Sequence, residues 1–517
     1  MDFSLRTVRS LNRLCKKPLR IISYKGASTT ALKEQPNSEI LNRFNDDIKA
    51  GGVVPVFRRA FLFPSRVALQ DEIGIYTYSG LHRAASALSD EISVYLSGDT
   101  GMTVAYLCRN DASHVITQWA IWMSGNVAVP LSSLHPPDMI KYFITDSTAK
   151  LVICTQEHEK LLRSITSELS VPLLIKGREK EITAQFYQPD SSFLEPKPEE
   201  GMIDVGKSNL WYGDSDALIV YTSGTTSKPK GVVWTHSMLN THISALHCAW
   251  QYSANDVVLH TLPLHHIHGQ LNSLNASLAA GARIRMLPSF LSYMVWARLL
   301  GMGEREDAKI TVFHGVPAMY NRLVADHESM FNDSKTESYV RMTLSSKMRL
   351  MCVGSAPLPE TLYWKWEKIS GIRLLERYGM SEVGMALSNP YKPAERRVVG
   401  SVGLPLPGIS ARIAVQSEND PSKLTPLVTV QSSMPDEQRK PHEMLDQTAQ
   451  FRRVGTPRAP CRAWTCDERT VRYIIFKKTY PVTYLQMTLD VVSDVKIADV
   501  IIIISDFPRV SKLSRKR

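Results

Sequence analysis

A run of hydroxyl and lysine side chains between residues 221 and 232 has the composition of a phosphate-binding loop. Hydroxyls and exposed backbone N–H groups donate hydrogen bonds to phosphate oxygens, and lysines neutralise their charge. Glycines in the run allow the backbone to approach an anion closely. The spacing does not fit a Gly-x-x-x-x-Gly-Lys-Ser/Thr loop, so composition alone leaves a simple linker open. The candidate phosphate ligands are Thr222, Ser223, Gly224, Thr225, Thr226, Ser227, Lys228, Pro229 and Lys230.

Histidines gather in a second segment, between residues 260 and 268. Imidazole is a common zinc ligand, but no carboxylate or cysteine lies at ligand spacing, which disfavours a metal site. Two interpretations remain open on the residues alone. The histidines either cap the ends of strands or border a substrate pocket.

Three segments, in this order along the chain, resemble the AMP-forming acyl-CoA synthetases of the adenylate-forming superfamily. They are the loop at 221–232, the Gly-Ser-Ala-Pro-Leu-Pro run at 354–359 and the Glu-Arg-Tyr-Gly-Met-Ser-Glu run at 376–382. Ser227 stands where the family usually has glycine. The resemblance covers about residues 50–415 and implies ATP, Mg²⁺ and coenzyme A as cofactor and cosubstrates.

The resemblance also implies an adenine pocket. In the family, a turn after a buried strand lies on the adenine side, and its counterpart here is formed by Gly354, Ser355 and Ala356. An aromatic ring stacks near adenine, and that role falls to Tyr378, followed by Gly379.

The reacting groups follow from the same resemblance. Ser381 keeps the hydroxyl that contacts the α-phosphate, and Glu382 is the expected magnesium ligand. His266 matches the position nearest to the carboxylate that is activated. The implied reaction is acid–thiol ligation: ATP and a carboxylate give an acyl-adenylate and pyrophosphate, and CoA then displaces AMP to give a thioester.

The segments at 110–125 and 262–269 resemble the members of the family that make malonyl-CoA, which favours malonate, or methylmalonate, as the acid. A second carboxylate needs a cation, because an unpaired buried charge is costly. Arg349 is the first candidate and Arg322 the second, although each could be a surface arginine that extends into solvent. Composition does not distinguish malonate from a medium- or long-chain fatty acid.

Apolar runs of strand length recur through the chain and are separated by helix-length stretches. Runs that are apolar on both faces predict buried, largely parallel strands with helical crossovers, which is α/β architecture. We expect a large N-terminal adenylate-forming domain at residues 45–415. The runs lie at 104–108, 151–154, 218–221, 257–260, 310–313 and 350–353.

Net charge is concentrated at the two ends of the chain. Residues 1–33 carry +7 and residues 430–517 carry +6, which leaves −2 for the body between them. A near-neutral body disfavours nucleic-acid binding. The arginine-rich, acid-poor segment 1–33 is typical of a mitochondrial presequence, which predicts a matrix location, although a basic tail is the alternative. No apolar run approaches the roughly 20 residues of a transmembrane segment.

The resemblance fades near residue 415. The family's Thr-Gly-Asp, whose aspartate holds the ribose hydroxyls, is missing from 416–517, and Lys512 is the nearest match to the late catalytic lysine. This segment is either an aberrant end or a divergent small domain, since 473–476 and 500–504 could be strands. A nucleotide-binding isoform with impaired catalysis is therefore the alternative to an active ligase.

Overall fold

The structure is a computed structural model in which most of the first 416 residues are described. These are residues 36–176, 202–222, 228–302, 308–331 and 333–416. Further on, the backbone is described for the strands at 424–432, 451–453, 473–474 and 500–505. The expected presequence, the loop tip at 223–227 and Lys512 lie outside the described residues.

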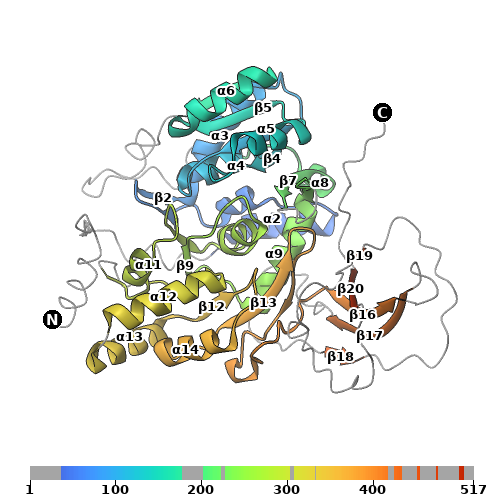
Figure 1. The fold of residues 1–517 in the computed structure, drawn as a ribbon. Helices are drawn as coiled ribbons and strands as arrows, with labels where there is room; N and C mark the ends of the chain where they lie inside the picture. Colours follow the sequence, from blue (N-terminus) through green and yellow to red (C-terminus); the bar gives the residue numbers. More distant parts are fainter. Residues whose placement is uncertain are drawn as a thin grey trace.

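A six-stranded sheet forms the upper part of the molecule in Figure 1, in the order β6-β5-β3-β4-β7-β8. Its strands are parallel except at one edge, where β7 and β8 form an antiparallel hairpin. The candidate phosphate loop is the connection of this hairpin. The strands are β3 (Thr103–Leu107), β4 (Val127–Pro130), β5 (Leu151–Thr155), β6 (Leu173–Lys176), β7 (Asp216–Tyr221) and β8 (Gly231–Thr235).

A nine-stranded sheet lies below it, in the order β15-β14-β13-β12-β11-β9-β10-β1-β2. The strands from β13 to β1 in this order are parallel, and antiparallel strands flank them at both ends. All six predicted apolar runs contain strands, so the prediction of mainly parallel sheets is confirmed. The strands are β1 (Val67–Gln70), β2 (Ile75–Thr77), β9 (Val257–His260), β10 (Arg283–Met286), β11 (Val312–Gly315), β12 (Leu350–Val353), β13 (Leu375–Met380), β14 (Gly384–Ser388) and β15 (Leu404–Pro405).

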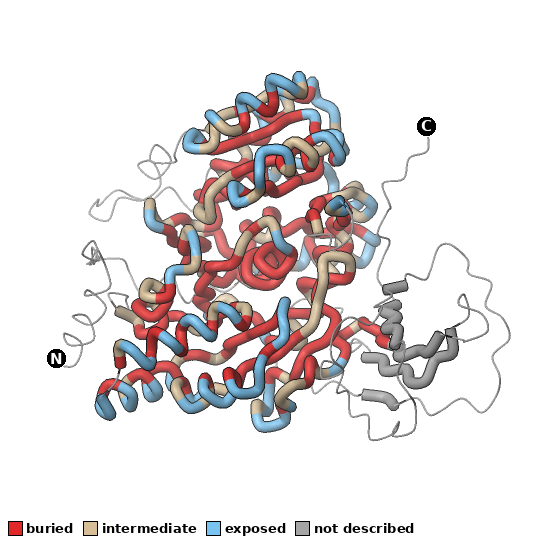
Figure 2. Tube along the Cα trace, viewed as in Figure 1, coloured by how far each residue is buried: buried red, intermediate tan, exposed pale blue. Residues whose placement is uncertain are grey.

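Helices form a central layer between the sheets and cover both outer faces. Because side chains alternate along a strand, Val104 and Tyr106 of β3 join the central core, whereas Ala105 and Leu107 pack toward α5 and α6. Figure 2 shows buried residues running through the middle and exposed residues on the outer helices. The central helices are α3 (Tyr78–Tyr95), α4 (Ala112–Met123), α9 (His236–Trp250), the π-helix η4 (His268–Asn275) and α10 (Ala276–Ala279). The outer ones are α5 (Pro137–Asp146), α6 (Glu159–Leu169), α11 (Ser292–Leu299), α12 (Pro317–Met330), α13 (Ser334–Lys347) and α14 (Glu360–Ser370).

Helix α4 is apolar around its whole circumference because it lies inside the central layer. Every residue from Ala112 to Met123 is buried, as expected of a helix that is enclosed by protein on all sides. Its first turn is capped by Asp111, whose carboxylate accepts a hydrogen bond from the backbone N–H of Ser113.

Among the described residues, no helix combines the length and the apolar character that a membrane crossing requires.

The last described strands form a five-stranded antiparallel sheet in the order β18-β17-β16-β20-β19. The strand predicted at 500–504 is confirmed as β20, and the one predicted at 473–476 is shorter. Strand β16 crosses the boundary expected at residue 415 and pairs with both β17 and β20. The strands are β16 (Ser410–Gln416), β17 (Leu424–Ser432), β18 (Phe451–Arg453), β19 (Tyr473–Ile474) and β20 (Val500–Ser505).

Candidate active site

The β7–β8 hairpin holds the two ends of the candidate phosphate loop together. The backbone N–H of Thr222 donates to the carbonyl oxygen of Lys230 at 3.0 Å, and the N–H of Lys230 lies 3.4 Å from Thr222 Oγ1. Lys230 is exposed, so its ammonium group is accessible to an anion. The sheet edge therefore positions the base of the loop.

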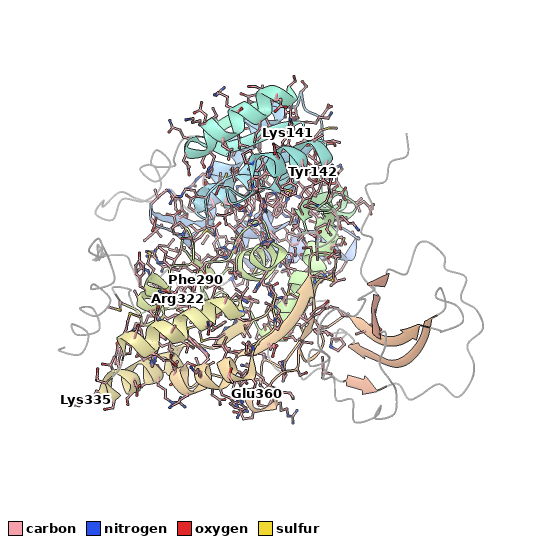
Figure 3. The ribbon with its side chains drawn as sticks, viewed as in Figure 1. Lys141, Tyr142, Phe290, Arg322, Lys335 and Glu360 are labelled. Carbon is pink, nitrogen blue, oxygen red and sulfur yellow. The ribbon has the colours of Figure 1, made fainter. Side chains whose placement is uncertain are left out.

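Tyr142 of α5 supports the same loop from the side. Its hydroxyl donates to the carbonyl oxygen of Pro229 at 2.9 Å. The Nζ of Lys228 lies 5.4 Å from the centre of the Tyr142 ring, which is a cation–π distance. Figure 3 labels Tyr142 in the upper part of the molecule, where α5 covers the six-stranded sheet.

A tight turn follows β12 at Gly354 and Ser355. A Cβ atom on Gly354 would lie 2.5 Å from the carbonyl oxygen of Arg377 and 2.9 Å from its Nε, so only glycine fits. Ser355 has a φ of +66°, in the left-handed region that L-residues seldom adopt. Ser355 and Ala356 are exposed. Backbone strain at an exposed turn is often found where a ligand binds.

The segment from Tyr378 to Glu382 lies in the β13–β14 hairpin. A Cβ atom on Gly379 would lie 2.2 Å from the carbonyl oxygen of Gly384 across the hairpin, so the close strand approach requires glycine. Burial, together with the nearby Glu382, raises the pKa of the Tyr378 phenol, which keeps the ring neutral. Ser381 and Glu382 are half-buried in the turn.

Trp234 of β8 joins this turn to the phosphate-loop hairpin. Its indole N–H donates to the carbonyl oxygen of Ser381 at 3.0 Å. Gly384 has a φ of +63°, and a Cβ atom there would lie 2.7 Å from both the Trp234 ring and the His242 ring. The hairpin that carries the candidate phosphate loop is thus in direct contact with the turn that carries Ser381 and Glu382.

The histidine segment is a loop between β9 and the π-helix η4, and polar side chains anchor it. Asn110 Nδ2 donates to the carbonyl oxygen of Leu262 at 2.9 Å, and Gln270 Nε2 donates to that of Leu264 at 2.7 Å. Gln118 of α4 donates to Gln270 Oε1 at 2.8 Å, which fixes the orientation of the Gln270 amide. The loop is therefore held from α4 and from the end of β3. π-Helical turns occur frequently at functional sites.

His266 lies at the exposed part of this loop. Its ring centre is 4.1 Å from that of His265, which in turn lies 5.0 Å from that of His135. The residue is exposed, but its ring is still partly desolvated. This desolvation, and to a smaller extent repulsion from His135, lowers the pKa of the ring. His266 is consequently a neutral ring near neutral pH, able to donate one hydrogen bond and accept another. In the described part of the chain, no cluster of three or more His, Cys, Asp or Glu could hold a metal ion.

Arg349, the first candidate for binding the second carboxylate of the substrate, forms an ion pair with Asp256. Its Nε lies 2.5 Å from Asp256 Oδ1 and its Nη2 lies 2.7 Å from Asp256 Oδ2, while Nη1 donates to the carbonyl oxygen of Trp250 at 2.7 Å. Arg349 and Asp256 directly precede the parallel strands β12 and β9. The pair therefore lies at the opposite end of β12 from Gly354, about 16 Å away for a separation of five residues along an extended strand. This geometry argues against Arg349 as a substrate ligand.

Arg322, the second candidate, lies on the outer helix α12 (Figure 3). Its side chain is 66% exposed, and its Nε lies 3.1 Å from Asp326 one turn further along the helix. An exposed i,i+4 pair on an outer helix is typical of a solvated surface. The geometry does not favour this arginine either.

Arg377 is the cation at the site that the sequence reasoning missed. It is 2% exposed, and its Nη2 donates to Ser355 Oγ at 3.0 Å, which links the Gly354 turn to β13. The sequence did contain one indication of this residue, because Arg377 directly precedes Tyr378 in a strand that begins with the buried Leu375.

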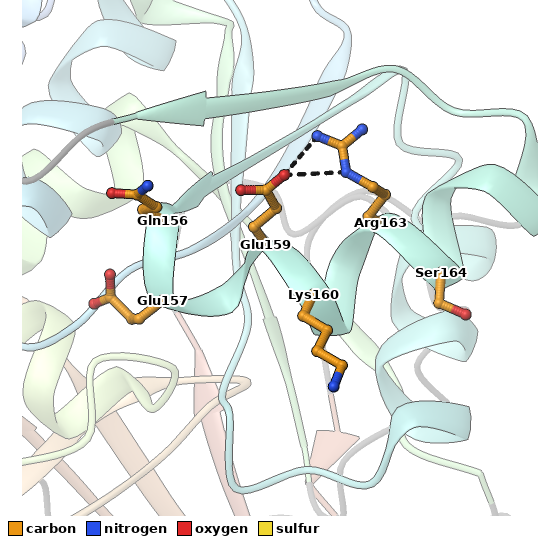
Figure 4. A pocket seen from close by; sticks show the side chains of 6 residues that line it. All are labelled: Gln156, Glu157, Glu159, Lys160, Arg163 and Ser164. Carbon is orange, nitrogen blue, oxygen red and sulfur yellow. Dashed lines mark hydrogen bonds and ion pairs between the residues drawn. The ribbon is translucent and has the colours of Figure 1, made fainter.

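A separate surface hollow lies on α6 and the residues before it, and Figure 4 shows it closely. An exposed ion pair between Arg163 and Glu159, 2.7 Å apart, crosses it. No residue of the three segments lines this hollow, so we do not assign it a role. Its lining residues are Gln156, Glu157, Glu159, Lys160, Arg163 and Ser164.

The chain matches the AMP-binding enzyme family over residues 56–425 and belongs to that family. It is 40% identical to the mitochondrial malonate–CoA ligase ACSF3 of Mus musculus, over 80% of this chain and 67% of the relative. The Homo sapiens ligase of the same name is 41% identical, over 71% of this chain and 61% of the relative. The chain thus matches about three fifths to two thirds of the length of these relatives. The family resemblance inferred from the three segments is confirmed.

Solved structures show the same fold. The crystal structure of ATP-bound MatB from Rhodopseudomonas palustris has a TM-score of 0.58 and 28% identity, over 73% of this chain and 70% of that chain. A malonyl-CoA ligase complex with methylmalonyl-CoA and AMP bound has a TM-score of 0.52 and 25% identity, over 76% and 72% of the two chains.

Proposed function

We propose that this protein is an ATP-dependent acid–CoA ligase that forms malonyl-CoA, or methylmalonyl-CoA, through an acyl-adenylate. The observation that carries the proposal is the hydrogen bond from Trp234 to Ser381, because it brings the phosphate-loop hairpin and the Tyr378–Glu382 turn to one place. The names of the relatives support the choice of acid. We further propose that residues 45–415 form the adenylate-forming domain and that 416–517 form a divergent C-terminal region.

The first step would join the acid to AMP. A carboxylate oxygen attacks the α-phosphorus of ATP, and the bond to the β-phosphate breaks with release of pyrophosphate. Lys228, Lys230 and the hydroxyls of residues 222–227 would offset charge on the phosphates, and the Ser381 hydroxyl would contact the α-phosphate. Adenine would lie between the Gly354 turn and the ring of Tyr378. The work of these groups is positioning and charge neutralisation.

The donor set fits magnesium at Glu382. In nucleotide sites this ion usually takes one or two carboxylates together with substrate phosphates and waters, and Glu382 is a half-buried carboxylate in the turn beside Ser381. We propose Glu382 as the magnesium ligand. When bound, the ion would neutralise phosphate charge.

His266 would orient the acid for this attack. A neutral imidazole can donate its N–H to one carboxylate oxygen and leave the other free to react. The anchored loop would hold the ring in one orientation, because Asn110 and Gln270 fix the backbone carbonyls of Leu262 and Leu264 just before it.

The second step would be attack of the CoA thiol on the acyl carbon, with AMP as the leaving group. In the resemblance this half-reaction uses the small C-terminal domain, and Lys512 is our candidate for its lysine. The sequence of 416–517 has no Thr-Gly-Asp, which favours a second candidate function, a nucleotide-binding isoform that adenylates poorly. We propose a mitochondrial location, in the matrix, for a chain whose residues 1–33 act as a presequence.

Malonate-dependent exchange of pyrophosphate into ATP tests the first step, and malonyl-CoA formation tests the second. Exchange and thioester together support the ligase. Weak exchange without thioester supports the impaired isoform, and absence of both with any acid contradicts the ligase proposal. Location is tested by imaging the full chain beside one that lacks residues 1–33, which should stay in the cytosol.

A further inference from the structure

A continuous row of aromatic rings connects the phosphate-loop hairpin to His266. The ring of Tyr221, the last residue of β7, stacks on that of Phe143 of α5, with the ring centres 4.2 Å apart. Phe143 meets the ring of His135 edge to face at 5.2 Å, and His135 meets that of His265 in the same way at 5.0 Å. The ring centre of His266 lies 4.1 Å from that of His265. Stacked and edge-to-face pairs are the geometries that rings prefer, so the row is a packed connection between two parts of the candidate site.

The loop between β4 and α5 holds His135 in place. The buried Ser132 accepts two hydrogen bonds, one at its carbonyl oxygen from the N–H of His135 and one at Oγ from the N–H of Leu134, both at 3.2 Å. Helix α5 begins two residues further on, at Pro137. Because β4 and β7 are neighbouring parallel strands, the loops that follow them leave the same edge of the sheet. His135 is therefore placed beside the phosphate-loop hairpin by the backbone itself.

Helix α5 also fixes both ends of the candidate phosphate loop. The hydroxyl of the buried Tyr221, which directly precedes the loop, donates to Asp146 Oδ2 at 2.9 Å. At the other end of the loop, the hydroxyl of Tyr142 donates to the carbonyl oxygen of Pro229. The same helix therefore contacts the phosphate loop and the ring of His135.

Packing alone does not account for a histidine at position 135. The side chain is partly buried, and its Nδ1 is buried without a hydrogen-bond partner among the described residues. A phenylalanine would fill similar space without burying an unpaired polar atom, which is costly. The imidazole therefore needs a further reason.

That reason lies in the neighbouring rings. Desolvation, followed by repulsion from His135, lowers the pKa of His266, and desolvation together with both of these rings lowers the pKa of His265 to about 3. The titratable groups that act on the cluster from the elements around it are histidines as well, His114 of α4 and His268 of η4. A proton on one ring disfavours a proton on the next, which keeps His266 neutral.

We infer that His135 is a positioning residue for adenylation: it holds the His265–His266 pair in the orientation that meets the acid, and through α5 it fixes that pair relative to the phosphate loop. The inference rests on the proposed ligase function. Adenylation joins an oxygen of the acid to a phosphorus of ATP, so its rate depends on the relative position of two groups that are bound on different segments. His135 lies between those segments and contacts the elements of both.

A double-mutant cycle tests whether His135 acts through His266. Malonate-dependent exchange of pyrophosphate into ATP is measured at about pH 8, where imidazoles are neutral, for the full chain, His135→Ala, His266→Ala and the double variant. We expect His135→Ala to lower kcat about 10-fold while the KM for ATP changes less than about 2-fold, because misplacing a reacting group slows the chemical step. In the His266→Ala background, the same change should lower kcat less than about 2-fold. An equal fall in both backgrounds, or no fall in His135→Ala, would overturn the inference.

Two further variants separate orientation from folding. His135→Phe keeps the ring contacts and should retain kcat within about 3-fold of the wild type. His327 of the outer helix α12 is the control, because its ring also packs against two others, Trp296 at 5.8 Å and Phe331 at 5.4 Å, and its Nε2 is buried without a partner in the described part of the chain. His327→Ala should lower stability and leave kcat unchanged. A kcat for His135→Phe as low as that of His135→Ala, or an equal fall in His327→Ala, would contradict a positioning role.

NMR titration of the His266 ring tests the imidazole without relying on activity. The resonance is assigned with His266→Ala, and its pKa is measured in the wild type, His135→Phe and His135→Ala. Both changes remove the repulsion and the alanine also admits water, so the pKa of His266 should rise in both and more in His135→Ala.

The titration also distinguishes failure of this inference from failure of the proposed function. If the wild-type chain exchanges pyrophosphate with no acid, the ligase proposal fails and the titration alone decides the role of His135. It decides equally if His266→Ala is too slow to measure, with His135→Phe in place of His135→Ala if the alanine variant does not fold. A raised pKa of His266 supports the inference, and a pKa that is the same in the wild type and the variants overturns it.

Discussion

Trp234 and Ser381 are 147 residues apart in the chain and are joined by one hydrogen bond, from the indole Nε1 to the main-chain carbonyl oxygen at 3.0 Å. The bond connects the six-stranded sheet, which carries the candidate phosphate loop, to the hairpin of the nine-stranded sheet, which carries Glu382. Charge on the phosphates would be offset from both sheets at once. The relative position of the two sheets at this point should therefore affect adenylation directly.

Changing Trp234 to Phe tests this coupling. The ring remains but the donor is lost, which leaves the Ser381 carbonyl without this bond and costs about 0.5–1.5 kcal/mol. We expect malonate-dependent exchange to slow by roughly 3- to 10-fold. Trp250→Phe is the control, because Trp250 is equally buried and loses a comparable bond, to Ser388 Oγ at 2.9 Å, outside the three segments. Equal losses of exchange in both variants would speak against a specific role for the Trp234 bond.

Changing Lys230 to Ala should weaken ATP binding. A charge-assisted contact to phosphate contributes about 1.5–3 kcal/mol, which corresponds to roughly 10- to 100-fold in the dissociation constant measured by calorimetry. Lys141→Ala is the control, because Lys141 pairs with Glu168 on the neighbouring outer helix and should not affect affinity. An ATP affinity that is the same in Lys230→Ala and the wild type would mean that Lys230 does not contact the phosphates of ATP.

Changing Arg349 to Leu should lower stability and leave acid preference intact. Asp256 has a side chain that is 2% exposed, and it would lose both of its bonds to the guanidinium. Breaking a buried pair by removing one partner costs about 3–5 kcal/mol in the free energy of unfolding. Arg322→Ala, at an exposed pair, should cost less than about 1 kcal/mol. A fall in the ratio of kcat/KM for malonate to that for propionate in Arg349→Leu would show that Arg349 contributes to acid binding.

These arginines show where sequence reasoning succeeds and where it stops. Continuous apolar runs predicted the strands correctly, because a strand buried on both faces has no polar alternation to obscure it. The expected role of Arg349 relied on its closeness in sequence to the Gly354 turn. Which strands flank Arg349 and Arg377 depends on the pairing of strands that are distant in the chain. Strand pairing of that kind is set by tertiary packing, and a single sequence does not display it.

Glu376 should make stability depend on pH. Its side chain is 4% exposed with Oε2 unpartnered, and burial raises its pKa from 4.5 to about 7. Between these values the unfolded chain releases the proton while the folded chain retains it, so stability falls as pH rises from 4.5 to 7. The loss is on the order of 3 kcal/mol and levels off above pH 7. Glu376→Gln should abolish this slope.

Urea unfolding at pH 5 and pH 7.5 measures the difference between the two chains. The wild type should lose stability relative to Glu376→Gln over that interval. Glu360→Gln, at the exposed start of α14, is the control and should not change the slope. A difference between the wild type and Glu376→Gln that is constant with pH would mean that Glu376 is ionised in the folded chain.

The last prediction concerns residues 416–517. The described residues include our candidate ATP ligands, so ATP should bind to the chain as it stands. These candidates are Thr222, Lys230, Tyr378, Ser381 and Glu382. The affinity should be lower than in an intact relative, because no Thr-Gly-Asp is present for the ribose hydroxyls and one lost bond to a charged group is worth about 1.5–3 kcal/mol.

Adenylation should suffer more than binding, because a missing lysine would act on charge that develops in the transition state. Thioester formation should be nearly absent, since the thiol half of the site belongs to the small domain in the family. Replacing 416–517 by the corresponding part of an intact malonate–CoA ligase should restore malonyl-CoA formation, measured by mass spectrometry of the product. If the unaltered chain already forms malonyl-CoA as fast as this chimera, the segment is a functional small domain. Lys512→Ala should then abolish the adenylation step while leaving ATP affinity within about 3-fold, because the contact contributes in the transition state rather than in the ground state.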